Sequence, residues 1–211
     1  MNITRQVAVE TWLKRGLNDF IVQFEALDHW EEYQPFFIHQ GLEKVCKAYL
    51  IGKNSSSYEH LTIDAARCEI DRLARSFRHR LGELVDQVGQ YVSGLDAVVG
   101  RRYDGYPGRK VLEVLEAGYL ESRYPVGEPI HCKFPIPNTD PQIYWEPLLS
   151  SSLEKCAFAV SRTIIKAAER DFSVSLPMEN PYRGKIGDHD WERFSRLFFG
   201  REVLCAECKA G

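Results

Sequence analysis

The chain has 211 residues, of which 44% are hydrophobic and 27% charged, the proportions of a compact globular protein. Twenty-seven Lys and Arg residues oppose 30 Asp and Glu residues, and the net charge of −3 excludes a chain that is basic throughout. Any contact with nucleic acid must therefore come from a local basic patch. A chain of this length buries enough apolar surface to fold without a metal or a disulfide.

The sequence contains no apolar run that approaches the ~20 residues needed to span a bilayer. Thr4, Arg5 and Gln6 follow the first residues, where a secretion signal would be apolar. We therefore expect a cytoplasmic protein without a membrane segment. The six cysteines are scattered, three of them in helical patterns among apolar neighbours, so we expect no disulfide framework.

Apolar residues spaced three and four apart predict amphipathic helices over residues 8–27 and 33–53. In the second helix Glu43 and Lys47 are four positions apart, and we expect this pair on the face opposite the apolar stripe. His39 lies in the same helix, where a partly buried, hydrogen-bonded histidine is expected.

Between residues 63 and 99 the apolar positions repeat every seven residues, which predicts one long helix. The two rows are Ile70, Phe77, Leu84 and Tyr91, and Ala74, Leu81, Val88 and Leu95. The seam fits either a bundle helix that packs on its neighbours or the two-fold seam of a dimer. We favour the bundle helix, because bundles use the same packing.

Residues 100–108 are predicted to form a turn-rich connection, and residues 110–119 a short fourth helix. Six prolines between positions 125 and 147 exclude a regular helix and predict an extended arm. Helices are again expected over 150–170 and from Asp188 onward. The predicted fold is all-α, with a helical bundle over 1–126, the proline-rich arm over 127–149, and a C-terminal helical extension over 150–211 that packs on the bundle.

Three segments together resemble the HEPN domain family, named for a nucleotide-binding domain of higher eukaryotes and prokaryotes. They are WLKRGLNDF (12–20), PFFIHQGLEKVCKAYL (35–50) and YLESRYP (119–125), and HQGLEKVCKAYL (39–50) is the most specific of the matching elements. The resemblance covers about residues 7–126. It implies an antiparallel up-and-down helical bundle that forms a homodimer and acts on RNA or nucleotides, with a cognate antitoxin or a nucleotidyltransferase-type protein as a further partner.

Catalytic members of that family carry an Arg, four to six intervening residues and a His, and residues 72–79 contain such a motif. On a continuous helix Arg72 and His79 would share one face about 10 Å apart, with Arg75 one turn from His79. Histidine exchanges protons near neutral pH, and guanidinium groups stabilise a crowded phosphate. We therefore predict His79 as acid/base and Arg72 and Arg75 as phosphate-binding cations; the alternative is a solvated basic helix face.

A second group of cations surrounds Tyr103 and Tyr106. Cations beside aromatic rings can neutralise phosphates and stack a base, although a solvated turn between helices has the same composition. The predicted nucleotide- or RNA-binding residues are Arg78, Arg101, Arg102, Arg109 and Lys110.

Cys205 and Cys208 form a CxxC pair, but a closed zinc site needs four ligands and no second pair is visible. We therefore predict neither a metal nor a cofactor. The leading hypothesis is a metal-independent endoribonuclease of the toxin or defence type. The alternatives are a non-catalytic nucleotide- or RNA-binding dimerisation module and a structural partner subunit.

Overall fold

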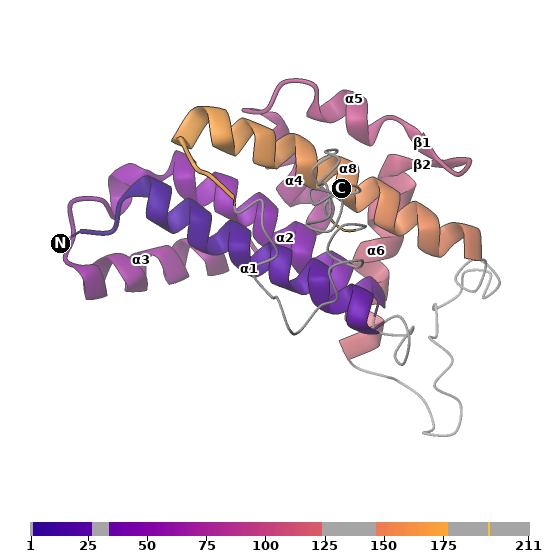
Figure 1. Ribbon diagram of the computed structural model, residues 1–211, viewed down its shortest axis with the longest axis horizontal. Coiled ribbons are helices and arrows are strands. Elements are labelled where there is room, and N and C mark those ends of the chain that lie inside the picture. Colours follow the sequence, from indigo (N-terminus) through magenta and orange to yellow (C-terminus); the bar gives the residue numbers. More distant parts are fainter. Residues whose placement is uncertain (1, 27–33, 124–146, 177–193, 195–211) are drawn as a thin grey trace, which may run out of the picture.

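The computed structural model describes residues 2–26, 34–123, 147–176 and 194. This part of the chain is mostly helical, which confirms the all-α prediction (Figure 1). The elements are α1 (Arg5–Ala26), α2 (Gln34–Lys53), the short 3-10 helix η2 (Ser55–Ser57), α3 (Ile63–Ser76), α4 (Leu81–Gly89), α5 (Leu95–Val99), β1 (Arg102–Tyr103), β2 (Tyr106–Pro107), α6 (Gly108–Arg123) and α8 (Pro147–Phe172).

Helices α1 and α2 pack closely in antiparallel directions. A Cβ atom added to Gly16 of α1 would lie 2.8 Å from the Gly41 carbonyl oxygen, and one added to Gly52 would lie 2.7 Å from Val9. Early residues of α1 therefore meet late residues of α2. The absence of side chains at these glycines lets the two backbones approach each other.

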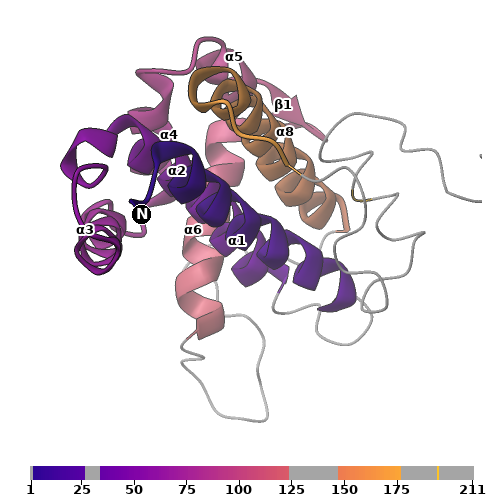
Figure 2. The same ribbon diagram turned by 60° about the vertical axis from the view of Figure 1, so that its left-hand side comes forward.

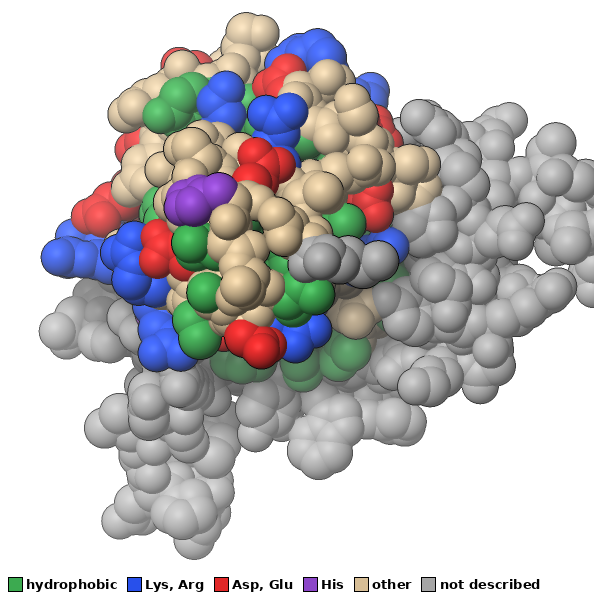
Figure 3. Space-filling view, turned by 90° about the vertical axis from the view of Figure 1, so that its left-hand side faces the viewer, with side chains coloured by type: hydrophobic (Ala, Val, Ile, Leu, Met, Phe, Trp, Pro, Cys, Tyr) green, Lys and Arg blue, Asp and Glu red, His purple; other side chains and the backbone are tan. Residues whose placement is uncertain are grey.

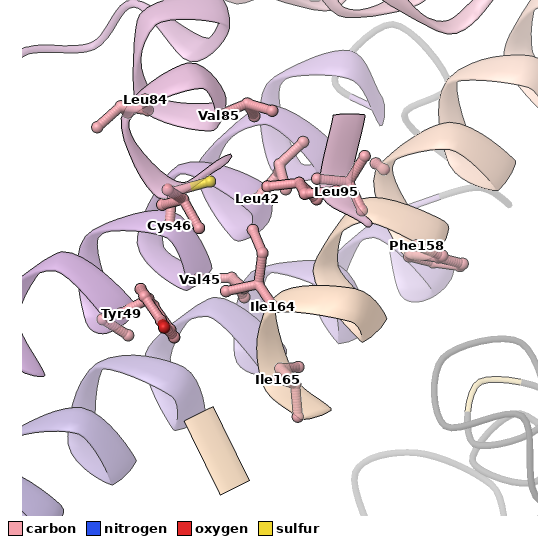
Figure 4. Close-up of a cluster of buried hydrophobic side chains, with 14 of the residues drawn as sticks. Leu42, Val45, Cys46, Tyr49, Leu84, Val85, Leu95, Phe158, Ile164 and Ile165 are labelled. Atoms are coloured by element: carbon pink, nitrogen blue, oxygen red, sulfur yellow. The ribbon is translucent and has the colours of Figure 1, made fainter. Parts of the chain in front are cut away.

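Helix α2 is central, and its side chains enter the main core together with those of α4, α5 and α8 (Figure 4). Leu42 and Val45 of α2 lie in one cluster with Leu84, Leu95 and Ile164. Because α8 shares this core, it packs against α2 and α5.

The prediction of one long helix over residues 63–99 is wrong. Helix α3 ends at Ser76, Arg78 has a left-handed φ of 56°, and α4 begins only at Leu81. A second interruption follows α4, where Gly94 has a φ of 83°. A right-handed helix cannot continue through positive φ values, so the heptad spacing is distributed over three short helices.

This interruption divides the predicted seam between two hydrophobic clusters. Leu84, Val88 and Leu95 enter the main core, whereas Ile70 and Ala74 belong to a smaller second cluster. The second cluster consists of Ala8, Ile51, Tyr58, Ala66, Ile70, Leu73 and Ala74. Figures 1 and 2 both show α3 at one side of the molecule, away from α8.

The predicted turn-rich connection contains a tight β-hairpin. Strand β1 pairs antiparallel with β2, and the two residues between them, Asp104 and Gly105, have φ values of 48° and 93°. Positive φ at both positions is the geometry of the two-residue turns that favour Asp-Gly. The Ser152 hydroxyl donates a hydrogen bond to the Tyr103 carbonyl, which attaches the hairpin to α8.

Some sequence predictions lie outside the described residues. These are the arm up to residue 146, the helix from Asp188 apart from the buried Phe194, and the pair Cys205 and Cys208. Helix α8 begins at Pro147, so residues 147–149 are helical and not part of an extended arm. Among the helices of the described ranges, none is long and apolar enough to cross a membrane.

Candidate functional site

Glu43 of α2 is a buried carboxylate, with an exposed fraction of 4%. The Lys47 ammonium, also buried, lies 2.8 Å from Glu43 Oε1. The face that carries this pair, away from the apolar stripe, is therefore buried as well. Fourteen of the 20 residues of α2 are buried, because other elements cover the helix on several faces.

His79 reaches this carboxylate from the turn between α3 and α4. Its Nδ1 atom lies 3.0 Å from each of the two Glu43 oxygens, although the two residues are 36 positions apart in the chain. The His79 side chain is 60% exposed and that of Glu43 only 5%. The ring is thus held from the interior and remains accessible from the solvent side.

His39, one turn earlier in α2, lies next to the same carboxylate. It is fully buried, beyond the partial burial expected, and its Nδ1 atom is 3.6 Å from Glu43 Oε2. Burial lowers the pKa of His39 from 6.5 to about 4, and the charges of His79 and Lys47 act in the same direction, while Glu43 opposes them. His39 is therefore neutral at physiological pH, and the counter-ion of Glu43 is the buried Lys47.

The turn that presents His79 has an unusual backbone. Arg78 has a φ of 56°, a conformation that is uncommon for residues other than glycine, Asn and Asp. Phe77, the residue before Arg78, is half-buried and packs against both hydrophobic clusters, which holds its position. Left-handed non-glycine residues persist only where their surroundings hold them, as Phe77 and the His79–Glu43 contact do on the two sides of Arg78.

The four arginines around this turn differ in their contacts. Arg72 makes a bidentate pair with Glu69, with N···O distances of 2.7 and 2.6 Å, and Arg80 lies 2.7 Å from Glu83. Within the described ranges, neither Arg75 nor Arg78 has an ion-pair partner among the acidic side chains. Figure 3 shows the end of the molecule at which the N-terminus and α3 lie, and there Lys and Arg alternate with Asp and Glu.

The predicted geometry of the Arg72–His79 motif is wrong, because it assumed a continuous helix. The helix ends between the two residues, so the spacing of seven positions no longer corresponds to two turns on one face. The structure places Arg78 beside His79 in the turn, and Arg75 in the last turn of α3. Arg72 is bound to Glu69 through Nε and Nη2, so that carboxylate already balances much of its charge.

The second predicted set of cations is spread over the hairpin and the start of α6. Arg102 donates to the Gly105 carbonyl of its own turn, Arg109 lies 2.7 Å from Asp86, and Lys110 lies 3.2 Å from Glu113. Exposed ion pairs of this kind contribute about 0.2–1 kcal/mol, so a phosphate could replace them. Each of these three side chains thus contacts a backbone carbonyl or a carboxylate, of the hairpin, α4 and α6 respectively.

The cluster around Glu43 can support proton transfer. A carboxylate that holds one nitrogen of an imidazole orients the ring, and an accessible histidine gains or loses a proton near neutral pH. Cys46 lies one turn from Leu42 and is fully buried, and burial raises the pKa of its thiol, which excludes it as an accessible nucleophile. In the described part of the chain, no three or more His, Cys, Asp or Glu side chains are grouped to hold a metal ion.

Glu43 is the residue of this cluster to which sequence reasoning gave no functional role. Its spacing from Lys47 is typical of a solvated pair, whereas the informative signal lies in its neighbours. Ile38, Leu42 and Val45 form the recognised apolar stripe, but Leu50 and Ile51 extend apolar character to other faces. A helix that is apolar on several faces is typically enclosed, and charges within it must be paired.

Comparison with known proteins adds no assignment to this geometry. No protein family, curated protein or solved structure matches the chain. The resemblance to the HEPN family consequently depends on the segments around residues 12–20, 35–50 and 119–125, and it remains a hypothesis.

Proposed function

We propose that this chain is a HEPN-like protein that acts on RNA or nucleotides, and that it cleaves RNA as a metal-independent endoribonuclease of the toxin or defence type. One observation carries the proposal: the His79 ring is exposed to solvent while the buried carboxylate of Glu43 holds its Nδ1 atom at 3.0 Å. An oriented and accessible imidazole of this kind is suited to act as an acid/base. Arg75 and Arg78 support it as nearby cations without acidic partners among the described residues.

Metal-free RNA cleavage requires two proton transfers. The 2′-hydroxyl loses its proton and its oxygen bonds to phosphorus, the bond from phosphorus to the 5′-oxygen breaks, and that oxygen takes up a proton. The products are a 2′,3′-cyclic phosphate and a 5′-hydroxyl. His79 would carry one of these transfers, and the cations Arg75 and Arg78 would stabilise the negative charge that develops on the phosphate.

The proposal is tested by incubating the purified protein with single-stranded RNA in EDTA. We expect cleavage that yields 2′,3′-cyclic phosphate ends, and a decrease of about 10²- to 10⁴-fold with His79→Ala. His60→Ala is the matched control, because His60 is exposed on the loop before α3 and belongs to no part of the site. An RNA with 2′-deoxyriboses should resist cleavage.

Equal cleavage by the His79→Ala protein would refute the assignment of His79. RNA that is bound but never cut would favour the non-catalytic binding module instead. In that case the affinity should fall with rising salt and with substitution of Arg101, Arg102, Arg109 or Lys110.

A further inference from the structure

Resting on the proposed function, we infer that Glu43 is a positioning residue for His79. Glu43 accepts a hydrogen bond from the Nδ1–H of His79, and this selects Nε2 as the atom that exchanges a proton with the substrate. Glu43 thereby sets both the tautomer of His79 and the atom that reacts.

The hydrogen-bond chemistry of the two groups leads to this assignment. An ionised carboxylate only accepts hydrogen bonds, and His79 Nδ1 is 3.0 Å from both Glu43 oxygens, so Nδ1 must be the donor. A neutral imidazole has a single N–H. When that hydrogen is on Nδ1, Nε2 carries the lone pair that takes up a proton.

The burial of Glu43 makes this selection stringent. Its side chain is 5% exposed, and Lys47 Nζ lies 2.8 Å from Oε1 as the compensating cation. A carboxylate enclosed in this way cannot rotate into water, unlike the exposed Glu83 partner of Arg80. The central helix α2 therefore provides a rigid acceptor for a ring that lies on a turn.

The contact between Glu43 and His79 also attaches the α3–α4 turn to α2, so a purely structural role is the competing explanation. The two roles differ in what happens at Nε2. A structural contact needs any donor at the Nδ1 position, whereas positioning for catalysis needs in addition a basic Nε2 atom.

The first test measures the tautomer of His79 by ¹⁵N NMR of histidine-labelled protein at a pH where the ring is neutral. In the unaltered protein we expect the Nδ1–H form to predominate. In Glu43→Gln the amide can donate as well as accept, so we expect a mixture with the Nε2–H form. Glu83→Gln is the matched control, because it makes the same chemical change at an exposed partner of Arg80 near this turn and should leave the tautomer unchanged.

The second test uses cleavage kinetics in EDTA. We expect Glu43→Gln to lower kcat by roughly 10- to 100-fold with little change in KM, since orientation and not RNA binding is impaired. His79→Asn keeps an N–H donor near the Nδ1 position but has no Nε2. It should fold with the thermal stability of the unaltered protein and be inactive.

An Nε2–H tautomer in the unaltered protein would overturn the inference, as would a tautomer that Glu43→Gln leaves unchanged. Cleavage by His79→Asn would overturn it too. The NMR comparison of the unaltered protein with Glu43→Gln needs no substrate. Absence of RNA cleavage by the unaltered protein would therefore refute the proposed function alone, while the tautomer would still decide whether Glu43 orients His79.

Discussion

Glu43 of α2 places a negative charge in the protein interior, and the surrounding residues show how the fold tolerates this charge. A buried ion is destabilising unless a counter-ion and hydrogen bonds compensate its lost hydration. Here Lys47 provides the counter-ion and His79 the hydrogen bond, while His39 adds a neutral ring on the inner side. The same contacts thus compensate the buried charge and hold the exposed imidazole.

His39 predicts how stability depends on pH. The folded protein keeps His39 neutral down to about pH 4, whereas in the unfolded chain it takes up a proton near pH 6.5. Acid therefore favours the unfolded state, and about 3 kcal/mol of stability that is present above pH 6.5 should be lost as the pH falls to 4. Urea unfolding at intervals between pH 7 and 4.5 measures this loss.

His39→Gln provides the comparison, because glutamine has no proton to gain in this range. The charged groups that face position 39 are Glu43, Lys47 and His79, and all three remain in the variant. We expect the variant to show a markedly flatter dependence of unfolding free energy on pH. Equal slopes in the two proteins would show that another group is responsible.

At the scale of the elements, the pairing of α1 with α2 depends on glycines at their contact. A Cβ atom added to Gly41 would lie 2.8 Å from the ring of Phe20, which is itself fully buried. By contrast, a Cβ added to Gly82 in the first turn of α4 meets nothing closer than 4.0 Å. Glycine thus has opposite effects at the two positions.

Gly41→Ala should therefore destabilise the protein by about 1–3 kcal/mol through overpacking against α1. Gly82→Ala should stabilise it by about 0.5–1 kcal/mol, since alanine loses less backbone entropy in a helix. Chemical denaturation of the two variants measures both changes. A stabilised Gly41→Ala protein would show that the two helices are not as closely packed as described.

Several elements were predictable from local spacing alone. The apolar positions of α1, α2 and α8 identify these helices to within a few residues of their observed ends, because amphipathic periodicity is a property of the segment itself. The same reasoning failed over residues 63–99. A heptad pattern records which residues avoid water and not whether they enter the same core.

At the scale of the whole molecule, the buried residues of α3 belong to the smaller second hydrophobic cluster. Four of its 14 residues are buried, compared with 14 of the 20 residues of α2. Its links to the rest of the protein include the Phe77 ring and the contact between His79 and Glu43. Regions with few buried apolar contacts open most readily in the native state.

We therefore expect the backbone amides of α3 to become open to deuterium exchange more easily than those of α2. The free energy of opening should be at least about 1 kcal/mol lower for α3 than for α2. Native-state hydrogen exchange monitored by NMR measures both values. His79→Ala should accelerate exchange more near the C-terminal end of α3 than in α2. Equal protection of α3 and α2 against hydrogen exchange would instead show that the two hydrophobic clusters unfold as one cooperative unit.

By itself the sequence determined the helical class and the positions of the longer helices, since these follow from residue type and local spacing. The choice of His79 as a candidate acid/base came from the resemblance to the HEPN family. The tertiary structure decided that α3 and α4 are separate and that Glu43 is buried against His79. The two residues are 36 positions apart, and their contact exists only because the left-handed turn at Arg78 returns the chain to α2. Such a contact follows from packing over the whole fold, and no local pattern encodes it.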